Sequence, residues 1–233
     1  MTTVLLIRHG RTSANTAGVL AGRTSGVVLD EVGHQQAAEV AARVAGVPLR
    51  TVLTSPLRRC RQTALALVAN RVDACPIQVE PGLVECGYGE WTGKSLRELS
   101  KDKLWGAVQQ QPSAVRFPGG ESMSEMSARA VGAIRSWDAR MGTEHGSEAV
   151  WAAVSHGDPI KAILADALGL HLDQFQRIVV DPASISVVTY TETRPFVLRI
   201  NDTGGDVAGL IPPKKRRRRT ASSDAVVGGG AGA

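Results

Sequence analysis

The sequence predicts an α/β protein, a three-layer α/β/α sandwich around a mostly parallel sheet. The first signal is a pair of apolar runs, residues 4–7 and 149–154, each followed by a polar residue, a histidine and a glycine. Continuous rather than alternating apolar residues are typical of strands that are buried on both faces. The second signal is the alternation of strand-like and helix-like segments, which indicates a doubly wound sheet with helices on both sides. A chain of 233 residues can bury such a core without disulfides or metals.

The first half of the chain is predicted to hold three strands and two helices. A loop rich in Gly, Ser, Thr and Asn (12–26) leads to a helix that begins near Asp30 and ends at Gly46. Ser55 and Pro56 have the form of an N-cap followed by a first helical residue, so a second helix is expected to start there. The strands are predicted at residues 4–7, 51–54 and 77–80.

The second half is predicted to begin with a long helix and to end in strands. Ser122 and Glu125 form the pattern of a capping box that opens a helix to about Met141. Asp158 and Pro159 again have the form of a cap and a first helical residue. The other predicted elements are a Gly-rich turn at 81–93, a short helix at 95–103, a loop at 109–120, a helix up to 168, and strands near 175–180, 186–191 and 196–200.

The net charge of +5 is concentrated at the end of the chain. Six of the 27 Lys and Arg residues lie between Lys214 and Arg219, so the remainder, with nearly all of the 22 acidic residues, is close to neutral. From Gly204 onward the composition cannot bury enough apolar surface to order itself. We therefore expect one domain at 1–203 and a flexible basic tail at 204–233. We expect this tail to be solvated and flexible rather than to bind nucleic acid or an acidic partner, and the basic run would support nucleic-acid binding only weakly.

The cysteines indicate the compartment. Cys60, Cys75 and Cys86 are odd in number and lack CxxC spacing, so the sequence predicts neither a zinc site nor a disulfide framework. A reduced, cytoplasmic compartment is the simplest interpretation. Neither a signal peptide nor a run of about 18 apolar residues is visible, so no membrane partner is expected.

Polar side chains suited to anion binding follow three strand-to-helix junctions. Because the carboxyl ends of parallel strands meet at one edge of a sheet, these junctions should converge. Helix N-termini attract anions, and arginine pairs its donors with phosphate oxygens. The sequence therefore predicts a pocket for a phosphoryl group. The candidates are Arg8, His9, Arg11 and Asn15 at the first junction, Arg58, Arg59 and Arg61 at the second, and His156 at the third.

Five stretches, which together span residues 8–157, carry a family resemblance. They are Arg8-His9-Gly10-Arg11-Thr12 with Asn15, Ser55 to Ala64, Leu83-Val84-Glu85 with Gly89-Glu90-Trp91, Gly119-Gly120-Glu121-Ser122, and Val154-Ser155-His156-Gly157. In this order they resemble the histidine phosphatase superfamily, also called phosphoglycerate mutase-like proteins, whose fold is then expected. The alanine- and arginine-rich composition is similar to an actinobacterial branch of phosphomutases and acid phosphatases.

The resemblance implies a role for each matching residue. His9 would be the nucleophile that forms a phosphohistidine, and a neutral imidazole has the lone pair for that attack. Arg8, Arg59 and His156 would clamp the phosphoryl oxygens, and Glu85 would protonate the leaving alcohol. No metal and no cofactor is then needed, because guanidinium groups neutralise the transferring charge.

Further residues are expected to bind substrate. Asn15, Arg11, Ser155 and Gly157 are the candidates, with ordinary loop hydrogen bonding as the alternative for Asn15 and Arg11. Arg59 is preferred to Arg58 because the family pattern places the functional arginine two residues after Leu57.

The resemblance leaves the reaction open between hydrolysis and isomerisation. Mutases of the family usually carry Glu where this chain has Arg11, and they have a longer insertion before the second histidine. Both departures favour a phosphomonoesterase that acts on a small phosphorylated metabolite. A phosphomutase is the alternative, and a catalytically inactive protein that binds phosphorylated ligands or partners is another. Substrate choice is expected in the segment 91–120, and a homodimer remains open.

Overall fold

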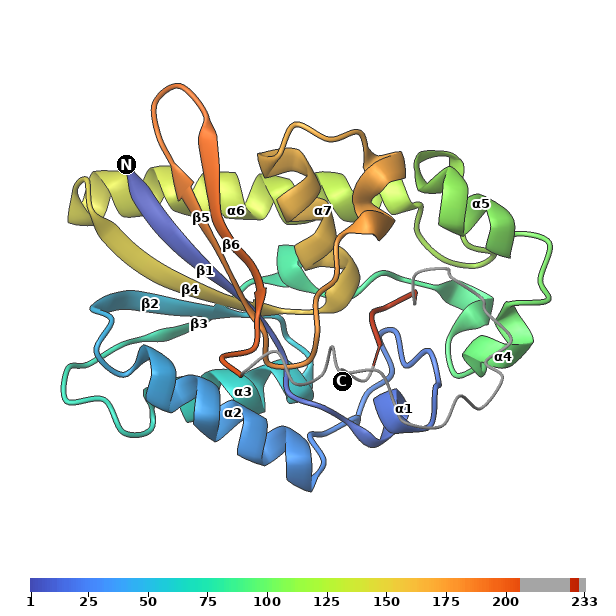
Figure 1. Cartoon of the computed structure of the whole chain (residues 1–233), viewed down its shortest axis with the longest axis horizontal. Helices are drawn as coiled ribbons and strands as arrows, with labels where there is room; N and C mark the ends of the chain where they lie inside the picture. The colour runs from blue at the N-terminus through green and yellow to red at the C-terminus, as the bar shows by residue number, and fades with distance from the viewer. Residues whose placement is uncertain (206–226, 231–233) are drawn as a thin grey trace.

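A six-stranded sheet forms the centre of the molecule (Figure 1). The computed structural model describes residues 1–205 and 227–230. The strand order is β3-β2-β4-β1-β5-β6, in which β3, β2, β4 and β1 pair in parallel, whereas β5 and β6 join antiparallel. The sheet is therefore mostly parallel, as the sequence predicts. The strands are β1 Thr2–Arg8, β2 Leu49–Thr54, β3 Ile77–Val79, β4 Ala149–Ser155, β5 Ile185–Tyr190 and β6 Pro195–Asp202.

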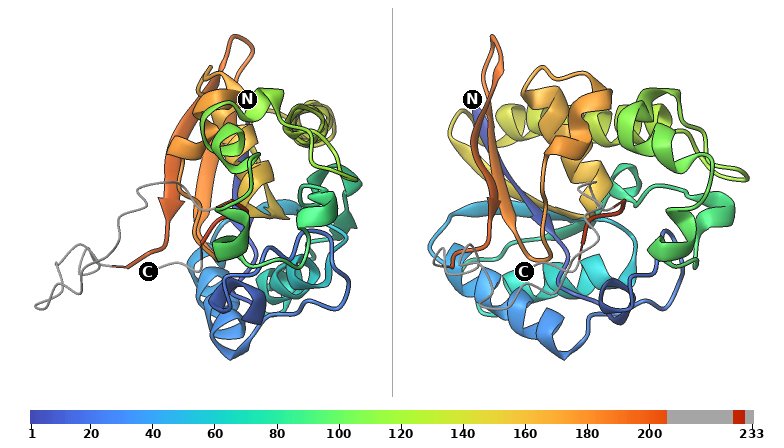
Figure 2. Two further views of the ribbon diagram at one scale, coloured as in Figure 1. Left: turned by 90° about the vertical axis from the view of Figure 1, so that its right-hand side faces the viewer. Right: turned by 45° about the vertical axis from the view of Figure 1, so that its right-hand side comes forward.

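Helices cover both faces of the sheet, with α2 and α3 on one side and α6 and α7 on the other (Figures 1 and 2). The α-helices are α1 Ser13–Thr16, α2 Glu31–Val44, α3 Arg58–Val68, α4 Leu96–Leu99, α5 Trp105–Gln110, α6 Met123–His145 and α7 Gly157–Ala167. The 3₁₀ turns are η1 Pro81–Leu83, η2 Gly89–Trp91, η3 Pro112–Ala114 and η4 Leu172–Arg177. This arrangement confirms the three-layer α/β/α sandwich.

The pleat of β1 explains its continuous apolar sequence. Successive side chains of a strand point to opposite faces, so a strand covered on both sides needs apolar residues at every position. Val4 and Leu6 belong to the core formed with α6 and α7, whereas Leu5 and Ile7 belong to the core formed with α2 and α3. The strand is thus held between two cores, and its polar end, Arg8, is placed at a defined depth.

Local capping chemistry sets two helix starts as predicted. The Asp30 side chain accepts a hydrogen bond from the Gly33 N–H at the start of α2. Ser122 and Glu125 form the expected capping box at the start of α6, which runs to His145. In both cases a short polar side chain satisfies an N–H group that has no partner inside the helix.

Two other predicted helix starts are wrong. The N-cap of α3 is Leu57, not Ser55, because the Ser55 hydroxyl hydrogen-bonds to His156. The N-cap of α7 is His156, so Pro159 lies in the first turn rather than at the first helical position. Proline is tolerated there because the first N–H groups of a helix lack intrahelical acceptors anyway.

Two further segments differ from the sequence prediction. Residues 175–180 do not form a strand, because the first half of this stretch belongs to the 3₁₀ turn η4, which the His171 side chain caps at the Asp173 N–H. The predicted loop at 109–120 holds the end of α5 and the turn η3. Short apolar runs do not distinguish a strand from a tight helical turn, and here the local cap decides.

The basic run at 214–219 lies outside the described residues, as does most of the expected tail. None of the helices that the structure describes is long and apolar enough to cross a membrane.

The double-sided burial of β1 predicts a large effect of truncating Ile7, whose side chain is fully buried. Ile7→Ala should lower the free energy of unfolding by about 2–5 kcal/mol, because the cavity cannot close between two packed layers. Val79→Ala on the edge strand β3, where the side chain is half exposed, should cost less than about 1 kcal/mol. Chemical denaturation of both variants measures the difference, and equal losses would contradict the two-core arrangement.

Candidate active site

The carboxyl ends of β1, β2 and β4 bring together the residues that sequence analysis placed at one edge of the sheet. Arg8 pairs with Ser155 in the β1–β4 register, so His9 and His156 follow at equivalent points of adjacent strands. The two imidazole rings lie edge to face with centroids 5.2 Å apart. His9, Arg59 and Glu85 line a cavity of about 220 Å³ next to them. The predicted convergence is confirmed.

The backbone after β1 is packed too closely to admit a side chain. A Cβ on Gly10 would lie 2.4 Å from the Gly33 carbonyl oxygen, and one on Gly33 would lie 2.0 Å from the Arg11 carbonyl oxygen. The Gly10 N–H also donates to the Thr63 hydroxyl of α3. The loop that carries His9 is therefore wedged between α2 and α3, which fixes the direction of the imidazole.

The hydrogen bonds of His9 select one tautomer. Its Nδ1 lies 2.7 Å from the Gly10 carbonyl oxygen, which can only accept, so Nδ1 carries the proton. Its Nε2 lies 3.2 Å from Nε of Arg59, a group that can only donate. Burial, followed by the positive charges of Arg59 and Arg8, lowers the pKa of His9 well below its ordinary value. His9 is therefore neutral, and the lone pair on its Nε2 accepts the hydrogen bond from Arg59.

Two guanidinium groups are buried beside His9: that of Arg59, which contacts this lone pair, and that of Arg8, the preceding residue. Each donates to a backbone carbonyl of the body of the protein: Val180 accepts from Nη1 of Arg8 at 2.8 Å, and Gly22 accepts from Nη2 of Arg59 at 2.8 Å. Within the described part of the chain, no acceptor reaches Nε of Arg8 or Nη1 of Arg59. Buried charged donors without partners are costly, so this arrangement favours a bound anion.

His156 lies behind His9 rather than in the cavity wall. Its Nε2 is 2.8 Å from the Ser55 hydroxyl, and the Sγ of Cys60 lies 3.4 Å away. Burial and then the charge of Arg59 lower its pKa well below the ordinary value, so this imidazole is also neutral. Burial raises the pKa of the Cys60 thiol to about 12, which leaves it protonated and unreactive.

Glu85 has the properties of a proton donor. Its carboxyl group is buried, and Oε1 accepts a hydrogen bond from the Cys86 N–H at 2.9 Å. Burial, with a further contribution from the negative charge of Asp158, raises the pKa of Glu85 to about 7. Glu85 is therefore protonated below neutral pH and loses its proton above it.

The predicted substrate-binding residues divide into two groups. Asn15 lines the cavity, and its Oδ1 accepts from Thr12, so the loop-bonding alternative holds for that atom. Arg11 instead forms an ion pair with Asp30 at 2.9 Å and does not line the cavity. The Ser155 hydroxyl donates to the Leu83 carbonyl oxygen at 2.7 Å and braces two segments. Gly157 is the first residue of α7 and also lies outside the wall.

At the second junction the structure places Arg59, rather than Arg58, in the site, as the sequence predicts. Arg59 is buried in the site, whereas Arg58 and Arg61 are exposed to solvent on α3. The helical period explains the division, because only one of these adjacent positions can face the sheet.

The cavity wall contains residues that sequence analysis did not identify. The segment 91–120, expected to govern substrate choice, contributes only Leu96 among the described lining residues. The wall instead includes the loop 18–22, Tyr88 and the C-terminal segment Val227–Gly230. A loop that is mostly glycine and small apolar residues carries no local pattern that would have revealed this role.

The C-terminal segment 227–230 binds directly to Arg8. The carbonyl oxygens of Gly230 and Gly229 accept from its guanidinium group at 2.9 and 3.2 Å, and Gly228 makes a longer contact at 3.4 Å. Val227 is buried, and the Gly228 N–H donates to Asp158. Figure 2 shows this segment, in dark red, inside the outline of the molecule in both views. Gly228, Gly229 and Gly230 line the cavity whereas Arg8 does not, so the segment covers Arg8 on the side of the cavity.

The acidic and sulfur-containing residues near the cavity do not form a metal site. Across residues 1–205 and 227–230, no group of three or more His, Cys, Asp or Glu side chains is arranged to hold a metal ion.

Comparisons with known proteins agree with this geometry. Residues 4–203 match the family model of the histidine phosphatase superfamily (branch 1). The chain is 29% identical over 213 residues to phosphoserine phosphatase 1 of Hydrogenobacter thermophilus, covering 87% of this chain and 93% of that protein. It is 32% identical over 214 residues to a protein of Erwinia tasmaniensis named "Probable phosphoglycerate mutase GpmB", covering 90% and 95%.

Solved structures share the fold. Bacillus stearothermophilus YhfR superposes with a TM-score of 0.77 at 25% identity, covering 87% of this chain and 98% of that one. A mycobacterial glucosyl-3-phosphoglycerate phosphatase superposes with a TM-score of 0.76 at 21% identity, covering 86% and 99%.

Because the C-terminal segment 227–230 occupies donors of Arg8, we expect it to weaken anion binding. Gly229 has φ +74°, and a Cβ there would lie 2.6 Å from Nη1 of the buried Arg8, so Gly229→Val should release the segment. Inorganic phosphate should then inhibit several-fold more tightly than in the unaltered chain. Gly205→Val, at a site with open space around it, should leave the inhibition constant unchanged. An unchanged constant for Gly229→Val would show that the segment does not compete for Arg8.

Proposed function

This chain belongs to the histidine phosphatase superfamily, and we propose that it is a metal-independent phosphomonoesterase that works through a phosphohistidine on His9. The observation that carries the proposal is the lone pair on Nε2 of His9, which faces Nε of Arg59, together with two buried guanidinium groups that each keep an N–H donor without an acceptor among the described residues. A phosphoryl group satisfies both requirements at once, because its oxygens accept from the arginines while its phosphorus meets the lone pair.

In the first step, Nε2 of His9 attacks the phosphorus and the bond to the ester oxygen breaks. Glu85 gives its proton to that oxygen, so the alcohol leaves uncharged. Arg8 and Arg59 hold the phosphoryl oxygens and stabilise their negative charge during the transfer, which removes the need for a metal ion. His156 supports the site from behind, where its ring lies against that of His9.

In the second step, water attacks the phosphohistidine. Glu85, now a carboxylate, accepts a proton from that water, as the reverse of its first role requires. The products are inorganic phosphate, the restored neutral imidazole and the protonated Glu85. The same donors hold the phosphoryl group in both steps, so nothing large has to move between them.

A phosphomutase is the second candidate, supported by the 32% identity to the relative named for that activity. It differs only in the acceptor, since a second hydroxyl of the substrate or product would take the phosphoryl group from His9. Arg11 favours the hydrolase, because mutases of the family usually carry Glu at this position. Labelling with a ³²P phosphoester distinguishes the two: release of labelled inorganic phosphate supports the hydrolase, whereas a long-lived phosphoenzyme with isomerised product supports the mutase.

The proposed substrate is a small phosphorylated metabolite, and the proposed compartment is the cytoplasm. A cavity of about 220 Å³ suits a small leaving group rather than a macromolecule. All three cysteines are free thiols, and Cys60 and Cys86 are buried, which suits a reducing compartment.

Replacing the nucleophile tests the proposal directly. His9→Ala should lower kcat by about 10³-fold or more and abolish acid-labile ³²P labelling, because removal of a covalent nucleophile costs orders of magnitude. His34→Ala, an exposed histidine on α2, is the matched control and should retain full activity. Undiminished hydrolysis by folded His9→Ala, checked by circular dichroism, would refute the phosphohistidine mechanism.

The ionisation of Glu85 predicts the alkaline side of the pH profile. The reactive form is protonated, so kcat/KM on an alkyl phosphate should fall as the pH rises through about 7. On the acid side activity should persist below pH 6.5, since the pKa of His9 is lowered and the imidazole stays neutral there. Glu85→Gln should remove the alkaline limb and reduce kcat by about 10²–10⁴-fold. A profile that rises through pH 7 would exclude Glu85 as the acid.

A further inference from the structure

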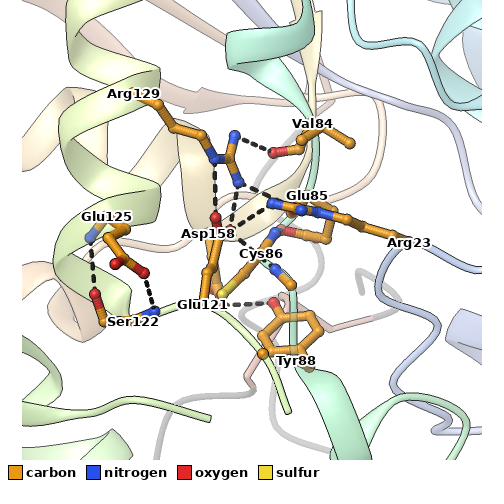
Figure 3. Close-up of polar contacts among 12 residues, drawn as sticks. Arg23, Val84, Glu85, Cys86, Tyr88, Glu121, Ser122, Glu125, Arg129 and Asp158 are labelled. Carbon is orange, nitrogen blue, oxygen red and sulfur yellow. Dashed lines mark hydrogen bonds and ion pairs between the residues drawn. The ribbon is translucent and has the colours of Figure 1, made fainter.

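One motif of the sequence, Gly119-Gly120-Glu121-Ser122, has no part in the chemistry above. Figure 3 shows that its glutamate meets Arg129 of α6 beside the loop that carries Glu85. We propose that Glu121 and Arg129 are positioning residues, which hold the backbone of this loop so that the Glu85 carboxyl group reaches the leaving oxygen. The inference rests on the proposed function, since it concerns the group assigned there as the acid.

Arg129 binds three carbonyl groups of the loop. Its Nη1 donates to Gly82 at 2.8 Å and to Val84 at 2.7 Å, and its Nη2 donates to Glu85 at 3.0 Å. These three carbonyls lie within a stretch of four residues, from the turn η1 to Glu85 itself. A planar guanidinium with donors at fixed angles therefore specifies the path of the chain up to the acid.

Glu121 holds the loop on the other side of Glu85. Its Oε1 accepts from the Gly87 N–H at 2.9 Å and from Nη2 of Arg129 at 2.6 Å. Arg23 adds a second ion pair to the same oxygen at 2.8 Å and donates from Nε to the Glu85 carbonyl oxygen at 2.8 Å. Although partial burial alone would raise the pKa of Glu121, the hydrogen bonds from Arg129 and Gly87 lower it, so the carboxylate stays charged.

The two glycines of the motif allow this contact. The Glu121 N–H donates to the Gly87 carbonyl oxygen at 2.9 Å, so two backbones run against each other. A Cβ on Gly120 would lie 2.2 Å from that oxygen, which no other residue could accommodate. The close approach of the two backbones therefore places the Glu121 side chain next to the loop that carries Glu85.

Ion pairs that are partly withdrawn from solvent contribute little net stability, because desolvation offsets the attraction. A geometric role explains this network better. Glu85 lies on irregular chain between η1 and η2, where neither a strand ladder nor a helix fixes its direction. Catalysis is sensitive to such placement, since a displacement of about 1 Å can cost about 100-fold in rate.

The test uses the dependence on the leaving group, because an acid matters most for a strongly basic leaving oxygen. Arg129→Ala in the full chain should lower kcat/KM for 2-glycerophosphate, which covers only the steps up to departure of the alcohol, by about 10- to 100-fold. It should lower kcat/KM for p-nitrophenyl phosphate, whose nitrophenolate leaves without a proton, by less than about threefold. Glu121→Gln, which keeps an acceptor for the Gly87 N–H, should show the same pattern with a smaller loss.

The matched control is Arg135→Ala on the same helix, where the arginine pairs with Asp166 away from the loop. It should leave kcat/KM for both esters unchanged. Equal losses on the two esters in Arg129→Ala and Glu121→Gln, or no loss on either, would overturn the positioning role while wild-type labelling at His9 still upheld the phosphatase. Absence of hydrolysis and of labelling in the wild type would overturn both.

Discussion

Among the residues that the structure describes, two buried arginine side chains form no ion pair. Arg8 and Arg59 are held by backbone carbonyl groups, and each keeps at least one N–H without an acceptor in the described chain. Placing cationic groups there is costly, and the cost is recovered when an anion occupies the cavity. Burial, and then these positive charges, lower the pKa of both histidines, so the proposed nucleophile is neutral when the site takes up an anion.

The pKa of the Glu85 carboxyl group also depends on these charges. Burial, and then Asp158, raise the pKa of Glu85, while the hydrogen bond from the Cys86 N–H and the charges of Arg59 and Arg8 act in the opposite direction. These opposing effects leave the pKa of a deeply buried carboxyl group near neutrality, where it can alternate between acid and base. The arginines proposed to hold the phosphoryl group therefore also contribute to the protonation states of His9 and Glu85.

Much of this arrangement could be predicted because it depends on local rules. The apolar runs predict buried parallel strands whose carboxyl ends meet at one edge, and the pairing of β1 with β4 places His9 and His156 together there. The caps at Asp30 and Ser122 follow from side-chain chemistry alone. Two of the predicted substrate-binding residues have partners elsewhere in the chain: Ser155 bonds to the Leu83 carbonyl, and Arg11 pairs with Asp30. No periodicity within either segment reports such a partner.

The chemistry and the cavity wall have different structural origins. The reacting groups follow strands or begin helices, where two cores and close glycine contacts fix them, whereas much of the wall comes from the loop 18–22 and the segment 227–230. Loops can vary while the scaffold stays constant, which suits a family whose relatives are named for different phosphoesters. The contact of Gly228, Gly229 and Gly230 with Arg8 links the two parts. An anion that takes those donors must displace the carbonyls, and by reciprocity a segment held in place weakens the binding of the anion by the same factor. The fold thus brings residues more than 200 positions from His9 in sequence against the arginine that precedes it.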